Sequence, residues 1–225
     1  MHKAIFYKEW LKIRWAVGLF LLLGLIVLVN IFLNVRYGVR FMDAHDYWYR
    51  IIIQGANYAA SLKYIPLLVG LGLGVAQYFP EIVNQRIKLT FHLPIRENKV
   101  LLIQQGFGLC CLLLVYALYI LIFVMGSSYF FPAEVIQMQL QTILPWFLGG
   151  LAAYSLTGLI MLEPLWIYRV LYTIIAYGFV SQYYLQAVPM AYSRVLWVFA
   201  LLSLVTVIVV LFSGYRFRKG EMHHG

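Results

Sequence analysis

Long apolar runs, separated by short segments that carry the charged residues, dominate the pattern of hydrophobic and polar positions along the chain. A helix of about 20 mostly apolar residues crosses the hydrocarbon core of a bilayer. Six runs approach or reach that length: about residues 15–35, 59–79, 100–125, 143–162, 170–185 and 195–212. Because backbone groups in lipid must be paired within the segment, each run predicts a transmembrane helix. We therefore expect an all-α integral membrane protein with six transmembrane helices in a single domain over residues 1–225.

The composition supports a membrane protein and excludes an ordinary soluble domain. Of the 225 residues, 64% are hydrophobic and only 11% are charged, whereas soluble domains have about 45–50% apolar and about 25% charged residues. The six runs also leave little sequence for a separate soluble catalytic domain. The first run is longer than the roughly 7–15-residue core of a signal peptide and ends in polar and basic residues, so we expect it to remain as the first helix.

The basic residues are distributed unequally between the two sides that the six runs would define. Twelve of the 17 fall on one side, namely Lys3, Lys8, Lys12, Arg14, Arg86, Lys88, Arg96, Lys99, Arg169, Arg216, Arg218 and Lys219. Lys and Arg accumulate in cytoplasmic loops. We therefore expect both termini in the cytoplasm and a multi-pass protein of the inner (cytoplasmic) membrane. This topology also accounts for the net charge of +9, so we expect membrane lipid, and no nucleic acid, as a partner.

The segment before the first run, residues 1–14, has an amphipathic pattern. Phe6, Trp10 and Ile13 share one face of a helix, while charged side chains including Lys8 and Lys12 occupy another. Such a helix lies in the headgroup plane, which predicts an N-terminal elbow helix. The alternative is a basic anchor without a partner.

Two prolines and several small residues interrupt the apolar runs. Pro145 falls in the first turn of the predicted fourth span, where its missing amide donor is tolerated. Pro66 precedes Gly70, Gly72 and Gly74 in the second span. Close helix packing is the default interpretation of these glycines, and flexing of the span near Pro66 is the sharper hypothesis.

The connection between the second and third runs contains an amphipathic segment over about residues 81–93. Its polar positions cluster on one side of a helix, and Ile82, Val83, Ile87, Leu89, Phe91 and Leu93 fill most of the remainder. A loop that only connected two spans would not need so many large apolar side chains. We expect a short helix, ending at Pro94, that is buried in the membrane interface or against another protein.

Together these features resemble the ABC-2 type permeases of ATP-binding-cassette transporters. The resemblance rests on the elbow-like run Tyr7-Lys8-Glu9-Trp10, the six spans with both ends inside, and a first cytoplasmic loop that opens with Glu81. The loop closes with His92-Leu93-Pro94-Ile95-Arg96, similar to the Leu-Pro-containing run before the third helix in that family. The order of elements matches over nearly the whole chain.

The resemblance implies that the loop is a coupling helix that docks into a separate ATPase subunit. The residues expected to make this contact are Glu81, Gln85, Arg86, Lys88, Leu89 and His92. It also implies an exporter of an unidentified substrate, built from two copies of the permease or from this chain and a related permease. ATP and Mg would be bound by the partner subunit, and this chain would bind no cofactor.

The distribution of chemically reactive residues agrees with transport that is driven by a separate ATPase subunit. All acidic residues lie in predicted loops or at span ends, whereas ion-driven carriers need an ionisable group at membrane depth. The chain contains no P-loop, so we expect no catalytic, cofactor-binding or metal site in it and no enzymatic activity of its own. The alternative function is a non-transporting membrane scaffold or assembly factor. An intramembrane enzyme would need a nucleophile, paired acids or a metal cluster at membrane depth, which the sequence does not show.

Tyrosines in the later spans form the candidate translocation path. The positions are Tyr154, Tyr168, Tyr172 and Tyr177, of which Tyr168 and Tyr172 are one helical turn apart. A polar, aromatic seam of this kind suits an amphiphile. The competing interpretation is that the hydroxyl groups bond between packed membrane helices.

Overall fold

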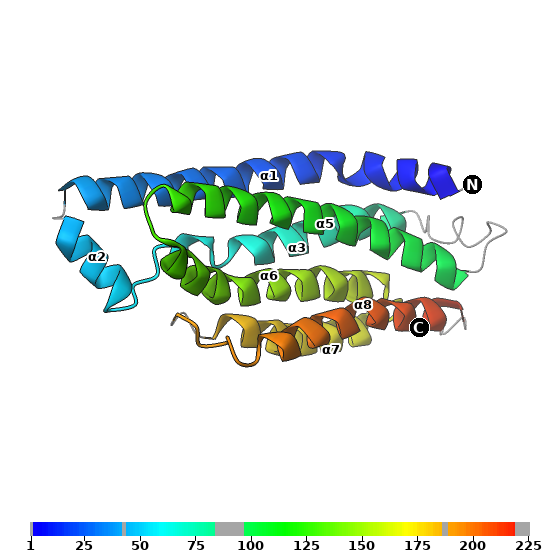
Figure 1. The fold of residues 1–225 in the computed structure, drawn as a ribbon. Coiled ribbons are helices and arrows are strands. Elements are labelled where there is room, and N and C mark those ends of the chain that lie inside the picture. The colour runs from blue at the N-terminus through cyan, green and yellow to red at the C-terminus, as the bar shows by residue number, and fades with distance from the viewer. Residues whose placement is uncertain (1, 42–43, 84–96, 186–188, 219–225) are drawn as a thin grey trace.

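In the computed structural model, every regular element of the described residues, 2–41, 44–83, 97–185 and 189–218, is a helix (Figure 1). The elements are α1 (His2–Phe41), α2 (Ala44–Ile52), η1 (Ala60–Leu62), α3 (Ile65–Ile82), α5 (Glu97–Ser128), α6 (Ala133–Leu162), α7 (Trp166–Ser181), η3 (Gln182–Tyr184) and α8 (Leu196–Arg218). The expected all-α fold class is therefore confirmed.

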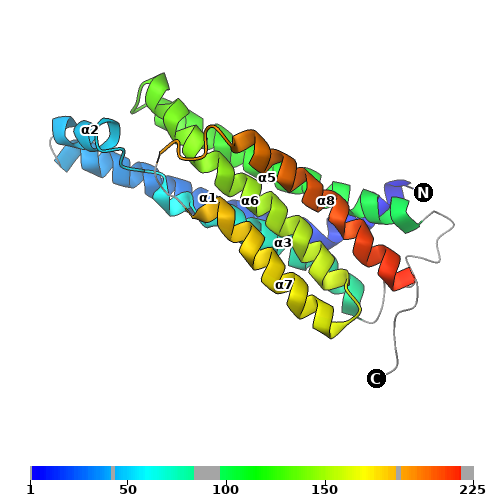
Figure 2. The ribbon, with the colours of Figure 1, turned by 90° about the horizontal axis from the view of Figure 1, so that it is seen from below.

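The long helices form an elongated bundle around α6. In Figure 1, α1 and α5 lie along one side, α7 and α8 along the other, and α3 and α6 between them. Of the most apolar window of α6, 78% is buried, against 17% for α1, so α6 is central and α1 peripheral. The first turns of α1 and the last turns of α8 lie at the same end of the bundle (Figures 1 and 2).

Four helical segments are long and apolar enough to cross a membrane. They are Phe6–Phe41, Ala60–Ile82, Lys99–Ser128 and Ala133–Leu162. The apolar part of α8, Leu196–Phe212, and the 16-residue α7 are shorter. Each of the six predicted runs lies largely on helix. The four long apolar segments indicate a membrane protein. Six crossings remain a prediction.

The N-terminal segment differs from the predicted elbow. Residues 2–14 are the first turns of α1, which continues without interruption for 40 residues, or roughly 60 Å. Neither proline nor glycine occurs before Gly18, and the basic residues in this stretch are good helix formers. Since α1 is about twice as long as the hydrocarbon core is thick, its ends extend beyond that core.

Both prolines occupy places that the apolar runs did not predict. Pro145 lies in the interior of α6 and not in its first turn, because the helix already begins at Ala133. The preceding turns contain Glu134 and several glutamines, which end an apolar run but favour a helix. Pro66 occupies the first turn of α3, where proline is well tolerated. It therefore starts the helix and does not provide a point of flexing within it.

Small residues allow α3 and α6 to pack closely. A Cβ atom built on Gly70 would lie 2.1 Å from the backbone oxygen of Gly150, and one on Gly74 would lie 2.9 Å from the Cβ of Thr157. No side chain larger than hydrogen fits at Gly70 without moving the two helices apart. The expected close packing is thus confirmed at these positions.

Candidate functional site

Two carboxylates are buried at the end of the bundle where the N-terminus lies. Glu9 of α1 is 2% exposed and Glu81, in the last turn of α3, is 1% exposed. Lys12 Nζ donates to Glu9 Oε1 at 2.5 Å and also to Glu81 Oε1. Lys8 Nζ lies 2.8 Å from the same Glu81 oxygen. The sequence predicted acidic residues at span ends, but here two of them point into the protein.

Helical spacing on α1 explains how this ion cluster forms. Lys8 and Lys12 are four residues apart, and Glu9 and Lys12 are three apart, so all three side chains lie on one face. That face turns inward and meets the end of α3. The two positive and two negative charges balance, which is the condition under which buried charges are tolerated.

The side-chain amide of Gln77, one turn before Glu81, extends the cluster to two further helices. Its Nε2 atom donates to Glu9 Oε2 at 3.0 Å and to the backbone oxygen of Gln104 at 2.7 Å. Its Oε1 atom accepts a hydrogen bond of 2.5 Å from the Tyr154 hydroxyl. Both donors and the acceptor of this buried amide are therefore used, and they join α1, α3, α5 and α6.

A second buried amide continues the connection toward the centre. Gln105 accepts a hydrogen bond from the Tyr78 hydroxyl and donates from Nε2 to Ser155 Oγ at 3.1 Å. The Tyr154 hydroxyl lies 3.4 Å from the backbone oxygen of Gln105. We call the whole set the polar network: Lys8, Glu9, Lys12, Gln77, Tyr78, Glu81, Gln104, Gln105, Tyr154 and Ser155.

The polar network connects four helices through side chains that pair with one another. Separating such buried partners is costly. Within the part of the chain that the structure describes, no group of three or more His, Cys, Asp or Glu residues could hold a metal ion. The arrangement can therefore fix four helices to one another near residue 84.

No family model, curated protein or solved structure matches the chain. The function must therefore be argued from the geometry of the site and from the sequence.

Of the predicted coupling residues, the structure describes Glu81 alone. Its carboxylate lies inside the polar network, where it contacts α1. The other five, Gln85, Arg86, Lys88, Leu89 and His92, lie outside the described residues. Their role stays a prediction.

The predicted elbow residues are distributed between the bundle and its surface. Ile13 is buried, whereas Phe6 and Trp10 are 43% and 44% exposed. The Phe6 ring packs against Phe107 of α5 with centroids 5.6 Å apart. The charged face that contains Glu9 also packs into the bundle. It does so because its charged groups form ion pairs and hydrogen bonds there.

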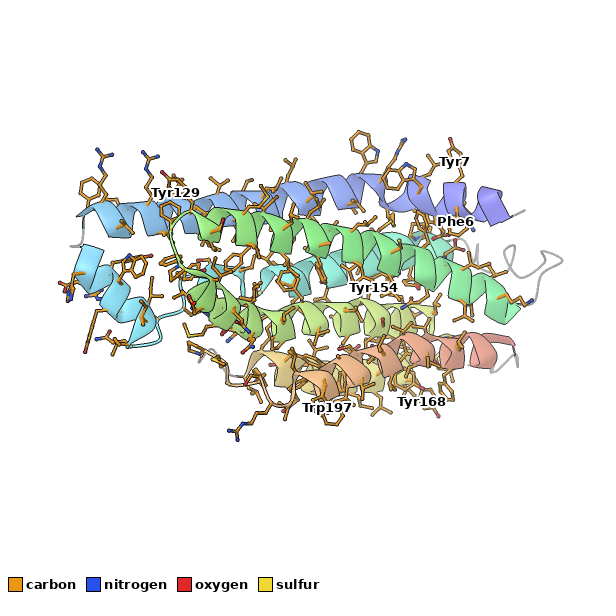
Figure 3. All side chains as sticks on the ribbon, viewed as in Figure 1. Phe6, Tyr7, Tyr129, Tyr154, Tyr168 and Trp197 are labelled. Carbon is orange, nitrogen blue, oxygen red and sulfur yellow. The ribbon has the colours of Figure 1, made fainter. Side chains whose placement is uncertain are left out.

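The four candidate tyrosines of the translocation path lie in different environments, and their role stays a prediction. Tyr154 is fully buried among the helices, whereas Tyr168 lies on the outer face of α7 (Figure 3). Tyr168 and Tyr172 are neighbours, with ring centroids 6.2 Å apart. Tyr172 and Tyr177 line two different cavities. The Tyr154 hydroxyl forms a hydrogen bond between helices, as the competing interpretation expects.

Gln77 and Tyr78 are two network members that sequence reasoning missed. Gln77 and Glu81 are four residues apart within an otherwise apolar span, so both lie on one helix face. Two strongly polar side chains on one face of a membrane helix indicate a buried partner. The spacing was therefore the available signal, but the identity of the partner on α1 could not be read from it.

Proposed function

We propose that the chain is the permease subunit of an ATP-binding-cassette exporter of the ABC-2 type. ATP is hydrolysed, with Mg, by a separate subunit that docks on the segment of about residues 81–93. The observation that carries the proposal is the position of Glu81. This residue lies in the last turn of α3, three residues before position 84, and is ion-paired inside the bundle.

The polar network offers a route by which movement of the docking segment reaches the membrane helices. A pull on the end of α3 acts through Glu81 on Lys8 and Lys12 of α1, and through Gln77 on α5 and α6. Removing one partner of a buried ion pair costs about 3–5 kcal/mol. The contacts therefore resist separation, and the four helices move together when the docking segment moves.

The proposed orientation places the polar network at the cytoplasmic side. The end of the bundle that contains the network also has the starts of α1 and α5, which contribute Lys8, Lys12, Arg14 and Lys99. An excess of basic residues is typical of the cytoplasmic side. In this orientation six helices cross the inner membrane and both termini are cytoplasmic.

The proposal includes a second permease, either another copy or a related chain. One bundle of this size offers a single docking segment, whereas cassette ATPases work as pairs in the family that the sequence resembles. The large exposed apolar side chains on α1, such as Leu22 and Ile26, provide surface for lipid and for such a partner.

Co-purification with the ATPase subunit tests the proposal. We expect the double change Arg86→Glu and Lys88→Glu to abolish recovery of a Walker-type ATPase with the chain and to remove ATPase stimulation by it. The matched control is Arg36→Glu and Arg50→Glu, which reverses one exposed charge of α1 and one of α2. A wild-type chain that binds other membrane proteins but no ATPase would overturn the proposal in favour of the scaffold function.

A further inference from the structure

A groove of about 620 Å³ lies between α3, α6 and α7, away from the polar network. Its polar lining residues include Lys63, Tyr64, Thr157, Thr173, Ser181 and Tyr184. Most of the remaining wall is apolar, and it includes Leu156, Ala176 and Val180, which are buried. A largely apolar cavity with a few polar groups is typical of a ligand site.

The groove has the length of a lipid tail. Along α7 and η3 its lining extends from Thr173 to Leu185, or roughly 18 Å at about 1.5–2 Å per helical residue. This is more than half of the roughly 30 Å thickness of a hydrocarbon core. Its rim is accessible from the lipid side, because Tyr177 is 78% and Leu185 66% exposed.

A single positive charge marks one end of the groove. Among the described residues that line it, Lys63 alone is charged. Lys63 Nζ lies 5.4 Å from the centroid of the Tyr64 ring, and that ring stacks on Tyr184 at 5.9 Å. The Tyr184 hydroxyl donates to the Trp146 backbone oxygen at 2.7 Å, which fixes this wall. The structure records no carboxylate paired with Lys63 among the described residues.

We propose that this groove binds a phospholipid with an anionic headgroup. One acyl chain lies along α7 over Leu156 and Ala176, and the phosphate pairs with Lys63. Lys63 lies just before the start of α3 and Glu81 lies in its last turn, so the headgroup lies in the leaflet opposite the polar network. The proposal does not depend on the transporter assignment and holds equally for a membrane scaffold.

Charge favours the lipid over a second copy of the chain as the occupant. α7 contains no acidic residue, so a second copy that docked through its own α7 would bury Lys63 without a counter-charge. Burying an unpaired ammonium group is strongly unfavourable. An anionic phospholipid supplies both the counter-charge and the apolar chain.

Native mass spectrometry of the purified, delipidated chain tests the proposal. Dioleoylphosphatidylglycerol and dioleoylphosphatidylcholine are titrated separately and the bound lipid is counted. We expect tighter binding of phosphatidylglycerol, which Lys63→Gln weakens about fivefold and Lys63→Arg restores. Arg50→Gln, which removes an exposed charge outside the groove, leaves binding unchanged.

A second variant tests the acyl-chain site independently of the Lys63 charge. Thr173 is exposed and lines the groove, so Thr173→Trp fills the tail site without altering the packed core. We expect this variant to lose both lipids while it keeps the elution volume of the wild type. Equal retention of phosphatidylglycerol by the wild type and Lys63→Gln overturns the proposal. So does the formation of disulfide-linked dimers by Tyr177→Cys in a chain that lacks Cys110 and Cys111.

Discussion

Glu81 is the residue on which most of the account depends, because a buried carboxylate is stable only while its partners are present. Glu81→Gln leaves Glu9 as the one carboxylate of the cluster for two lysines, while the Lys12 side chain is only 10% exposed. The contact with Lys8 contributes less, because that side chain is 44% exposed and screened by water.

We therefore expect Glu81→Gln to lower the free energy of unfolding by about 3 kcal/mol, measured by thermal unfolding in detergent. Glu134→Gln is the matched control, because Glu134 is exposed in the first turn of α6. The same unfolding temperature for both variants would show that the ion cluster does not stabilise the bundle.

A second prediction at the scale of single residues concerns Tyr154. Tyr154→Phe removes the donor to Gln77 Oε1 and leaves a buried acceptor unpaired, which costs about 1–3 kcal/mol. Tyr177→Phe removes a hydroxyl from a largely exposed side chain and should cost little. Denaturant unfolding of both variants measures the difference, and equal stability would contradict the network geometry.

At the scale of helices, the apolar runs predicted where all six long elements lie but not all of their ends. Pattern analysis stops at polar residues, whereas a helix continues as long as its backbone can pair. The start of α6 at Ala133 and the continuity of α1 through residues 2–14 were missed for this reason. The position of Glu81 was noticed, but its partners on α1 depend on tertiary packing that no local pattern contains.

The close contact of α3 and α6 gives a prediction for whole helices. Gly70→Ala places a methyl group 2.1 Å from the Gly150 oxygen and should destabilise the bundle by about 1–3 kcal/mol through overpacking. Gly106→Ala is the control, because a Cβ atom there has no neighbour within 4 Å. Thermal unfolding of both compares the effects, and destabilisation by Gly106→Ala alone would contradict the helix arrangement.

At the scale of the whole molecule, orientation in the membrane is the next property to test. Tyr7 and Tyr129 are 65% and 85% exposed and lie toward opposite ends of the bundle (Figure 3). In a variant without Cys110 and Cys111, a membrane-impermeant maleimide added to intact cells should label Tyr129→Cys but not Tyr7→Cys. Labelling of Tyr7→Cys alone would place the basic end of the bundle outside and contradict the proposed topology.

The central claim is that the segment after Glu81 docks on a separate ATPase, and photo-cross-linking in cells tests it most directly. A photoreactive benzoylphenylalanine replaces His92 in the docking segment, and a matched probe replaces Tyr129 at the other end of the bundle. The account predicts that the probe at position 92 forms an adduct with a Walker-type ATPase and that the probe at position 129 does not. Adducts of position 92 with lipid alone would contradict it.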